Sequence, residues 1–436
     1  MATRLLLRNL TALFLISALL CACSSGGGGD SDSASSTASV RLVNLTSAGD
    51  LTLTVDDTSR GGAVASGAAS AYSSVDAETV GVFASSAGAA LSTSATSSTA
   101  FAGDTDYSVV AYERGGQIKL LVVTETDTTP SSGFALVTVN NADADAGNLD
   151  VYVVAPGADI TDRSPTFSIS VSSASTSNSV SAGTYDLVVT ASSKPADVRL
   201  RLPSVQLADA EVINLILTPT TGGALVDGAL VRQQGSISLM RNPSARVRVA
   251  AALPAGTGQN PVIVARVGGS ALGQVTAPSV GSAYGLVPAG ATSYDVQIDG
   301  VPLASLPPHT FSSGGDYTIV AYGGSAAAAD VNVLTDNNRL PANSGVRIRL
   351  VNAGVPTAGL SLSANSISLV SEVVFGDAST YSSISAGSNQ LVVTSPAISF
   401  TTYTSTQSLS ASSVYTLFVL NFSDSTTVKY VLTKDR

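Results

Sequence analysis

The stretch "VRIRLVNAG", Val346 to Gly354, alternates apolar and polar residues and is rich in β-branched side chains. A period of two predicts a β-strand with one buried face and one solvent face. Related runs are "VRLVN" from Val40, "ALVTVNNA" from Ala135 and "ARVRVAAAL" from Ala245. Their spacing indicates four copies of one plan, each of about a hundred residues.

A second landmark is a turn followed by a strand. An Ala-Gly pair supplies a permissive turn residue before each alternating apolar run. The stretches are "SAGTYDLVV" from Ser181, "PAGATSYDVQI" from Pro288 and "SAGSNQLVV" from Ser385. Three of the copies therefore share this turn-and-strand unit.

A third landmark places a tyrosine in corresponding strands of three copies. Tyr107 lies in "GDTDYSVVAY", Tyr317 in "GGDYTIVAY" and Tyr415 in "SSVYTLFVL". The second copy fills this slot with "ADAEVINLIL" from Ala208, which has no tyrosine. Exposed tyrosines could stack on sugars, but these recur in apolar strands. We expect buried structural tyrosines with satisfied hydroxyls.

Short strands with frequent turn signals predict an all-β chain of four tandem antiparallel, immunoglobulin-like β-sandwiches, arranged as a rod. The Ala/Ser stretch of residues 84–100 is interpreted as a loop and a polar edge strand. An outer-membrane barrel, which also alternates, is the rival fold; the absence of Trp and the scarcity of other aromatics disfavour it. The predicted boundaries are residues 1–22 for a signal peptide, 23–39 for a tether, and 40–132, 133–243, 244–341 and 342–436 for the sandwiches.

The N-terminus predicts export. Two arginines precede an apolar run of eleven residues, Leu10 to Leu20, which is too short to span a bilayer. "LCAC" after it resembles the bacterial lipobox, which implies cleavage between Ala22 and Cys23 and acylation of Cys23. Cys21 does not fit, because bulky Leu20 would precede it. An ordinary signal peptide is the alternative.

The residues after Cys23 predict where the protein is held. By the sorting rule of that lipoprotein family, Ser24 rather than Asp implies the outer membrane, with a periplasmic or cell-surface orientation. The Gly/Ser-rich residues up to Ser39 predict a flexible, lipidated tether.

Two junctions between copies resemble the bacterial family called domain of unknown function 4397. "YTIVAYGG" followed by "VLTDNNRLPANSGVRIRLVNAG" carries the resemblance between the third and fourth copies, and "VVTETDTTPSSGFALVTVNNA" repeats it between the first and second. The second copy departs most. The resemblance implies exported, often lipid-anchored β-sandwich repeats and brings no catalytic residues.

Composition excludes several functions. The net charge of −10 disfavours a nucleic-acid partner. One histidine and no mature cysteine beyond the acylated one exclude a Cys/His zinc site. His309, in "SLPPHTFSSGG", is interpreted as an exposed loop residue, because no G-x-S-x-G motif accompanies it. We therefore expect no enzyme and no cofactor; a hydrolase remains a weak alternative.

Acidic loops are the remaining candidates for a site. Asp143, Asp145 and Asp150 in "NNADADAGNLD" could supply oxygen ligands for calcium, but Asp and Asn are also ordinary turn residues, and we assign no metal. Further acidic residues are interpreted as turn residues: Asp104, Asp106 and Asp316.

These observations predict a non-catalytic envelope protein with a structural, adhesive or interaction role. Its partners would be the membrane, through the N-terminal lipid, and a protein or glycan of the envelope. The alternative is a module that binds carbohydrate or another envelope ligand, which should display exposed aromatic side chains on one face.

Overall fold

The computed structural model describes residues 36–85, 95–114, 117–125, 128–171, 173–175, 177–255, 259–281, 283–341, 344–354, 359–395, 403–420 and 428–436. These residues form β-strands joined by turns and loops, apart from one 3-10 turn, η1 (Ala326–Ala328). Within them we find no helix with the length and hydrophobicity of a membrane span. The predicted all-β class is confirmed.

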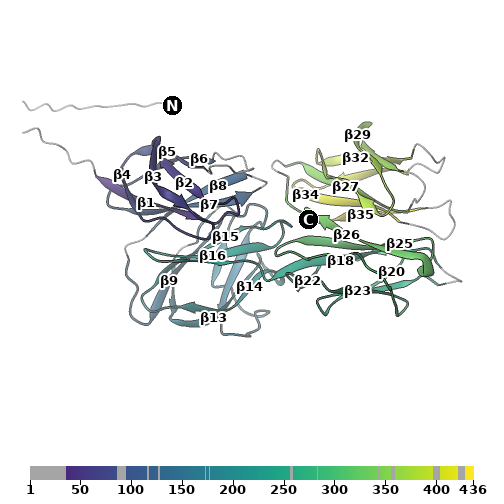
Figure 1. The fold of residues 1–436 in the computed structure, drawn as a ribbon, viewed down its shortest axis with the longest axis horizontal. Helices are drawn as coiled ribbons and strands as arrows, with labels where there is room; N and C mark the ends of the chain where they lie inside the picture. Colours follow the sequence, from purple (N-terminus) through teal and green to yellow (C-terminus); the bar gives the residue numbers. More distant parts are fainter. Residues whose placement is uncertain are drawn as a thin grey trace, which may run out of the picture.

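The strands group into four sandwiches, which we call repeats 1 to 4 (Figure 1). Repeat 1 comprises β1 (Thr37–Asn44), β2 (Leu51–Val55), β3 (Thr58–Val64), β4 (Ser73–Asp76), β5 (Thr79–Ser85), β6 (Ala95–Ala100), β7 (Asp106–Arg114) and β8 (Gln117–Thr124). Repeat 2 comprises β9 (Phe134–Asn141), β10 (Leu149–Val154), β11 (Phe167–Ile169), β12 (Asn178–Ser181), β13 (Gly183–Ala191), β14 (Lys194–Leu207), β15 (Val212–Pro219), β16 (Val226–Arg232) and β17 (Ile237–Met240).

Repeat 3 comprises β18 (Ser244–Ala252), β19 (Val262–Val267), β20 (Ser270–Thr276), β21 (Ser279–Val280), β22 (Gly285–Pro288), β23 (Tyr294–Ile298), β24 (Val301–Pro302), β25 (Asp316–Gly323) and β26 (Ala329–Asp336). Repeat 4 comprises β27 (Val346–Ala353), β28 (Leu360–Ala364), β29 (Ile367–Val373), β30 (Asp377–Ala378), β31 (Ser382–Ile384), β32 (Gly387–Thr394), β33 (Tyr403–Leu409), β34 (Ser413–Leu420) and β35 (Lys429–Lys434).

Each repeat has an inner sheet, which contains its first strand, and an outer sheet. The inner sheets have the orders β4-β1-β7-β8, β12-β9-β15-β16-β17, β21-β18-β25-β26 and β30-β27-β34-β35, with β22 and β31 also paired to β18 and β27. The outer sheets have the orders β3-β2-β5-β6, β11-β10-β13-β14, β20-β19-β23-β24 and β29-β28-β32-β33.

The inner sheets are mixed rather than purely antiparallel. The first strand of each repeat pairs in parallel with a late one: β1 with β7, β9 with β15, β18 with β25 and β27 with β34. The third landmark of the sequence therefore lies directly beside the first in every repeat. Parallel neighbours require a long connection, and here the outer sheet supplies it.

Every repeat buries its own apolar core between its two sheets. In repeat 4, Ile348 and Leu350 of the inner sheet pack with Leu362 and Val393 of the outer sheet. The other three repeats contain equivalent clusters. Alternating residues of each strand thus supply the core, as the period of two predicts.

Additional apolar clusters join the repeats in pairs. Val43, Val110 and Val123 of repeat 1 pack on Ile216 and Val231 of repeat 2. Repeats 3 and 4 pack in the same way through a second set: Ala250, Ala252, Val320, Leu334, Val351, Ala353, Phe418 and Leu420. Figure 1 shows repeat 1 stacked on repeat 2 and repeat 4 stacked on repeat 3. The expected rod is therefore wrong, because the inner sheets have two apolar faces and must bury both.

The three recurring tyrosines are buried and their hydroxyls have partners, as predicted. Each hydroxyl accepts a hydrogen bond from the backbone N–H five residues earlier, at 3.0 Å in every case: Ala102 to Tyr107, Ser312 to Tyr317 and Ser410 to Tyr415. Ile213 occupies this position in repeat 2. The tyrosine therefore fixes the loop that enters the late inner strand.

The Ala-Gly turns also form as predicted. Gly290 and Gly387 have φ angles of +77° and +101°, which disfavour any other residue, and they precede or begin β23 and β32. In the Ala/Ser stretch, β6 is an edge strand of an outer sheet, which confirms that part of the interpretation. The intervening residues 86–94 lie outside the described chain.

We predict that Tyr415→Phe will lower the free energy of unfolding by about 1–3 kcal/mol, because the Ser410 N–H loses its acceptor. Tyr430→Phe is a matched control in the same repeat, since its buried hydroxyl has no hydrogen-bond partner. Urea denaturation should show the control unchanged or slightly more stable. Equal destabilisation by the two substitutions would contradict this role for the tyrosine.

Candidate functional site

Apart from exposed Thr37 at the start of β1, the polar residues of the first inner strands are buried or half-buried, which corrects the expectation of a solvent face. Val40 and Leu42 enter the core of repeat 1, whereas Arg41 between them faces repeat 2 and is 2% exposed. Its guanidinium donates to the backbone carbonyls of Arg232 and Gly235 at 2.9 and 3.1 Å. The alternation of this strand therefore separates a core face from an interface between repeats.

Repeat 1 satisfies its buried arginine with a hydroxyl and a carboxylate. Arg41 Nε donates to Ser108 Oγ on the neighbouring β7 at 2.8 Å, and Nη2 donates to Glu125 at 2.9 Å. Tyr72 lies over the guanidinium at 4.9 Å and donates to the same carboxylate at 2.5 Å. Glu125 directly follows β8, the last strand of the repeat.

The buried arginines of repeats 3 and 4 also contact a hydroxyl and a carboxylate, but each takes its carboxylate from the other repeat, an arrangement that we call the exchange. Arg248 of repeat 3 donates to its own Thr318 at 2.9 Å and forms an ion pair with Asp435 of repeat 4 at 2.5 Å. Reciprocally, Arg349 of repeat 4 forms an ion pair with Asp336 of repeat 3. All four charged side chains are at most 3% exposed. The two repeats therefore satisfy each other's buried charges.

A tyrosine ring stacks on each of the two guanidiniums in this exchange. The guanidinium of Arg248 lies 4.8 Å from the ring of Tyr284, and that of Arg349 lies 4.9 Å from the ring of Tyr381. The Tyr284 hydroxyl donates to Asp336 at 2.7 Å. A planar guanidinium suits both a stacked ring and a carboxylate, so lysine could not replace these arginines without loss.

The ionisation of this network follows from its burial. Burial alone would raise the pKa of Asp336, but Arg349 and Arg248 outweigh it and hold that pKa below its usual range. Burial raises the pKa of Tyr284 well above its ordinary value, and the nearby Asp336 carboxylate raises it further. The charges are therefore permanent at physiological pH, and the tyrosine stays protonated as a donor.

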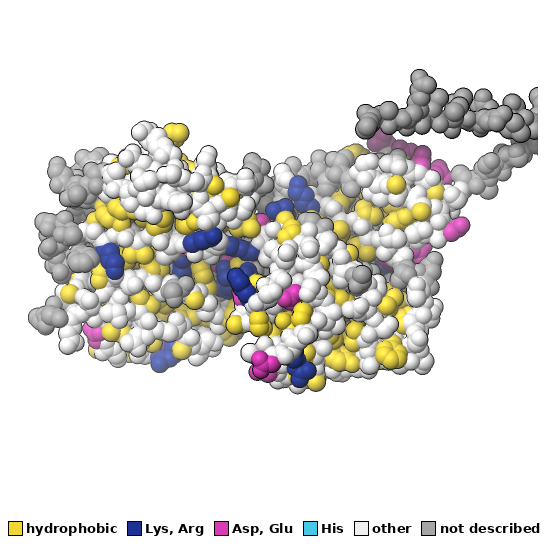
Figure 2. All heavy atoms as spheres, turned by 180° about the vertical axis from the view of Figure 1, so that it is seen from behind, with side chains coloured by type: hydrophobic (Ala, Val, Ile, Leu, Met, Phe, Trp, Pro, Cys, Tyr) yellow, Lys and Arg dark blue, Asp and Glu magenta, His cyan; other side chains and the backbone are white. Residues whose placement is uncertain are grey.

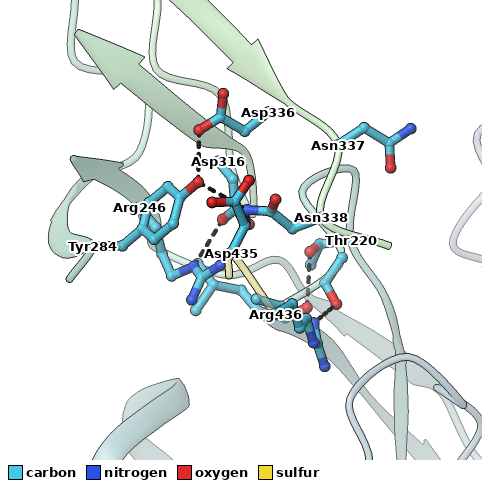
Figure 3. Close-up of polar contacts among 12 residues, drawn as sticks. Thr220, Arg246, Tyr284, Asp316, Asp336, Asn337, Asn338, Asp435 and Arg436 are labelled. Carbon is cyan, nitrogen blue, oxygen red and sulfur yellow. Dashed lines mark hydrogen bonds and ion pairs between the residues drawn. The ribbon is translucent and has the colours of Figure 1, made fainter. Parts of the chain in front are cut away.

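A polar junction joins repeat 3 to repeat 2 (Figure 3). Arg246 grips Asp316 with two hydrogen bonds of 2.8 and 2.6 Å, and Asn338 donates to the same carboxylate at 2.9 Å. Asp316 is fully buried at the start of β25, so its interpretation as a turn residue is wrong. Asp104, by contrast, does occupy a turn, with φ of +54°.

Glycines of repeat 2 allow the close approach at this junction. The Gly222 N–H donates to the Gly314 carbonyl at 3.0 Å, and its own carbonyl accepts from the Asn338 N–H at 2.9 Å. A Cβ on Gly222 would lie 2.7 Å from Asp316, and one on Gly223 would lie 2.6 Å from the Arg339 backbone. The Gly-Gly pair is therefore required for contact between the repeats.

Repeat 2 lacks the buried arginine. Thr138 stands in β9 where the other first strands carry the arginine, and it is paired with Asn214. Gln233, directly after β16, stands where the other three repeats have the acid. Repeat 2 instead offers backbone carbonyls to Arg41. The departure of the second copy, visible in its sequence, is thus a loss of one ion pair.

The three calcium candidates do not form a common site. Asp150 accepts from Ser168 Oγ and the Ser193 N–H, both at 2.7 Å, and so serves its own sheet. Asp145 pairs with Arg114 at 3.2 Å, and Asp143 accepts from the Asp145 N–H at 2.7 Å. In the described ranges no three acidic, His or Cys side chains gather as metal ligands. All three carboxylates are buried, so a solvated turn is also wrong.

His309 lies in a loop, as predicted, but it is half-buried rather than exposed. Its ring packs edge-on against Phe311 and Tyr317, with centroid distances of 4.8 and 4.9 Å. Nε2 has no hydrogen-bond partner, and burial lowers the pKa of the imidazole. These contacts indicate a packing role, with the neutral form favoured.

A basic cleft opens where the repeats meet. It has a volume of about 1130 Å³ and is lined by side chains of repeats 1, 2 and 4 and of the segment between repeats 3 and 4. The charged lining residues are Arg114, Lys119, Asp145, Arg339 and Arg347. Figure 2 shows Lys and Arg side chains gathered near the middle of one face of the molecule.

Sequence reasoning missed both the arginine network and the cleft. One signal was present: an arginine recurs inside the first strand of three copies, and an acid ends or directly follows the last strand of the same three, at Glu125, Asp336 and Asp435. The exchange of acids between repeats has no counterpart in sequence. The lipidation residues, Cys23 and Ala22, lie outside the described chain.

The N-terminal part of the chain matches a known family. Residues 38–152 match the family model described as "Domain of unknown function (DUF4397)". The match covers repeat 1 and continues into β10 of repeat 2. The resemblance seen at the junctions of the copies is therefore confirmed for this part of the chain. No curated protein matches the chain.

Solved structures give partial matches of low identity. A "putative cell adhesion protein" from Bacteroides uniformis is 14% identical and has a TM-score of 0.22; the match covers 48% of this chain and 99% of that one. The Bacillus anthracis TIE protein is 8% identical with a TM-score of 0.14, covering 90% and 68%. A second "putative cell adhesion protein", from Bacteroides eggerthii, is 11% identical with a TM-score of 0.15, covering 72% and 98%. These scores establish no common architecture.

We predict that Asp143→Asn will stabilise the protein at pH 7. Burial, aided by the Asp145 carboxylate, raises the pKa of Asp143 from 3.8 to about 6. The folded state therefore favours the protonated acid, and its stability falls as pH rises through about 6. The difference corresponds to about 3 kcal/mol, which the neutral amide should recover at pH 7 but not near pH 4.

Asp150→Asn is the control, because both oxygens of that carboxylate accept hydrogen bonds, from Ser168 and from the Ser193 N–H, and an amide has only one acceptor oxygen. Chemical denaturation across the pH range measures both variants. A stability gain that is equal at pH 4 and pH 7 would show that Asp143 does not titrate as described.

Proposed function

We propose that this chain, whose residues 38–152 match the domain of unknown function 4397, is a non-catalytic protein of the bacterial envelope. Its four sandwiches form a block that stands near the membrane and makes structural or adhesive contacts with other molecules. Its N-terminal lipid on Cys23 anchors the block in the outer membrane.

One observation carries the proposal: the buried arginines with several polar partners join one repeat to its neighbour. Arg41, Arg248 and Arg349 each use a hydroxyl, a carboxylate and a stacked tyrosine at an interface between repeats. In an enzyme, such perturbed groups would be expected to surround a cavity that holds substrate. Here the three arginines are at most 3% exposed, and each contacts a neighbouring repeat, which supports a role in fixing the arrangement of the domains.

The surface supports protein contacts more than sugar stacking. Among the aromatic residues that the structure describes, Phe134 is the exposed one, and the others are buried or half-buried. A carbohydrate module would be expected to display a platform of aromatic rings. The first alternative function therefore receives less support than an interaction role.

The anchor supports the location. A basic start, a short apolar run and "LCAC" resemble a lipoprotein signal, and the following Gly/Ser stretch gives a reach of about 20 Å. Several acyl chains hold a protein durably at a membrane. The block would then stand clear of the lipid headgroups.

We predict that Cys23→Ala will abolish fatty-acid labelling, leave the precursor uncleaved and remove partitioning of the processed form into detergent. Cys21→Ala is the matched control: it should change little, since Cys21 leaves with the signal peptide. Metabolic labelling with a fatty acid measures both. Label retained in Cys23→Ala but lost in Cys21→Ala would overturn the assignment, and a wild-type protein without label would refute the anchor.

A further inference from the structure

Repeats 3 and 4 differ at one position that leaves an arginine without an acid. Arg246 in β18 and Arg347 in β27 occupy the same place, two residues before the buried arginine of each strand. In the parallel register, Arg246 faces Asp316, whereas Arg347 faces Val414. The position that provides a carboxylate partner for Arg246 therefore carries an apolar side chain beside Arg347.

Arg347 is held in place by neutral oxygens. Its Nη1 donates to the Arg339 carbonyl at 2.8 Å and to Asn337 Oδ1 at 3.1 Å, and its guanidinium lies 4.8 Å from the Tyr381 ring. No ion pair of Arg347 is found among the described residues. Burial lowers the pKa of this guanidinium and outweighs the raising effects of nearby Tyr381 and Asp145. A positioned arginine therefore lacks the anion that its counterpart has.

The cleft around Arg347 carries an excess of positive charge. Arg114, Lys119 and Arg339 line it with Arg347, and Asp145 is the one acidic residue of the described lining. The formal charge is thus +4 − 1 = +3, in a chain with a net charge of −10. Such a local reversal of sign attracts an anionic group.

Two strand edges border the same cleft. β8, which carries Lys119, ends the order of its sheet, and β31 pairs only with β27 in the part of the chain that the structure describes. A sheet edge presents unpaired backbone donors and acceptors, which an added peptide strand can use. The described lining contains no aromatic side chain on which a sugar ring could stack.

We propose that this cleft binds an extended acidic peptide segment of a partner protein, with a peptide carboxylate on the side of Arg347 that faces the cleft. Arg347 would then have an anionic partner, as Arg246 has in Asp316. Lys119 holds a further carboxylate, and a strand edge accepts the peptide backbone. The proposal deepens the interaction role proposed above and rests on it. An anionic glycan is the competing ligand. It is disfavoured because a glycan cannot pair with the strand edges and because the described lining has no aromatic ring for a sugar to stack on.

Fluorescence anisotropy of a labelled peptide of about eight residues, alternating Glu and Thr, tests the proposal on the purified full chain. The wild type should bind, and Arg347→Gln should weaken binding by about tenfold or more. Raising NaCl to about 0.5 M should weaken it as well, because the cleft is open to solvent. Arg266→Gln is the matched control, since Arg266 is half-exposed, pairs with Asp295 and does not line the cleft.

Val414→Asp tests the same contact without removing a cation. It restores the internal acid that repeat 3 has at this position, so Arg347 should pair internally and peptide binding should be lost. Because Val414 is buried, the thermal unfolding of the Val414→Asp protein must first be shown to match that of the wild type. If it does not match, the binding result of Arg347→Gln alone tests the proposal.

Three outcomes would overturn the proposal: no binding of the peptide to the wild type, equal weakening by Arg347→Gln and Arg266→Gln, or binding of polygalacturonate as tight as that of the peptide. The last would identify a glycan site. None of these outcomes affects lipid labelling at Cys23, so the anchored location stands or falls separately.

Discussion

The structure depends on burying a guanidinium between two sheets. An arginine has five donors and a permanent charge, so it is stable inside a protein only where acceptors surround it. Arg349 illustrates the solution, with a threonine hydroxyl on the next strand, a backbone carbonyl and a carboxylate from the neighbouring repeat. Because the carboxylate comes from the other repeat, the charge is satisfied only when the two repeats are correctly stacked.

The apolar and charged contacts of the interface act together. Val351 and Phe418 bury apolar area between repeats 3 and 4, which favours association but specifies little about register. The two Arg–Asp pairs add direction, since a shifted sheet would leave buried charges without partners. Buried ion pairs contribute little net stability compared with apolar packing, but removing one partner is costly. We therefore interpret the exchange as a device that selects one arrangement.

Much of the fold follows from local pattern. The period of two, the Ala-Gly turns and the recurring tyrosines predict the sandwiches, because each is set by neighbours within one repeat. Sequence does not show which side of a strand meets solvent: Arg41 and Arg349 have the pattern of a polar face, yet they lie in interfaces. The packing of one repeat on another depends on apolar residues on both faces of the inner sheets. Their neighbours in sequence predict solvent-exposed turns or loops for Asp316, Asp143 and His309, but long-range packing buries the two acids and half-buries the histidine.

The most direct test of this account is a double-mutant cycle between Arg349 and Asp336, which lie in different repeats. Arg349→Met and Asp336→Asn should each lower the free energy of unfolding by about 3–5 kcal/mol, and the double variant should lose clearly less than the sum. Arg349→Met combined with Arg41→Met, at a separate interface, should instead be additive. Additivity within about 0.5 kcal/mol for Arg349 and Asp336 would contradict the claim that the exchanged ion pair couples the two repeats.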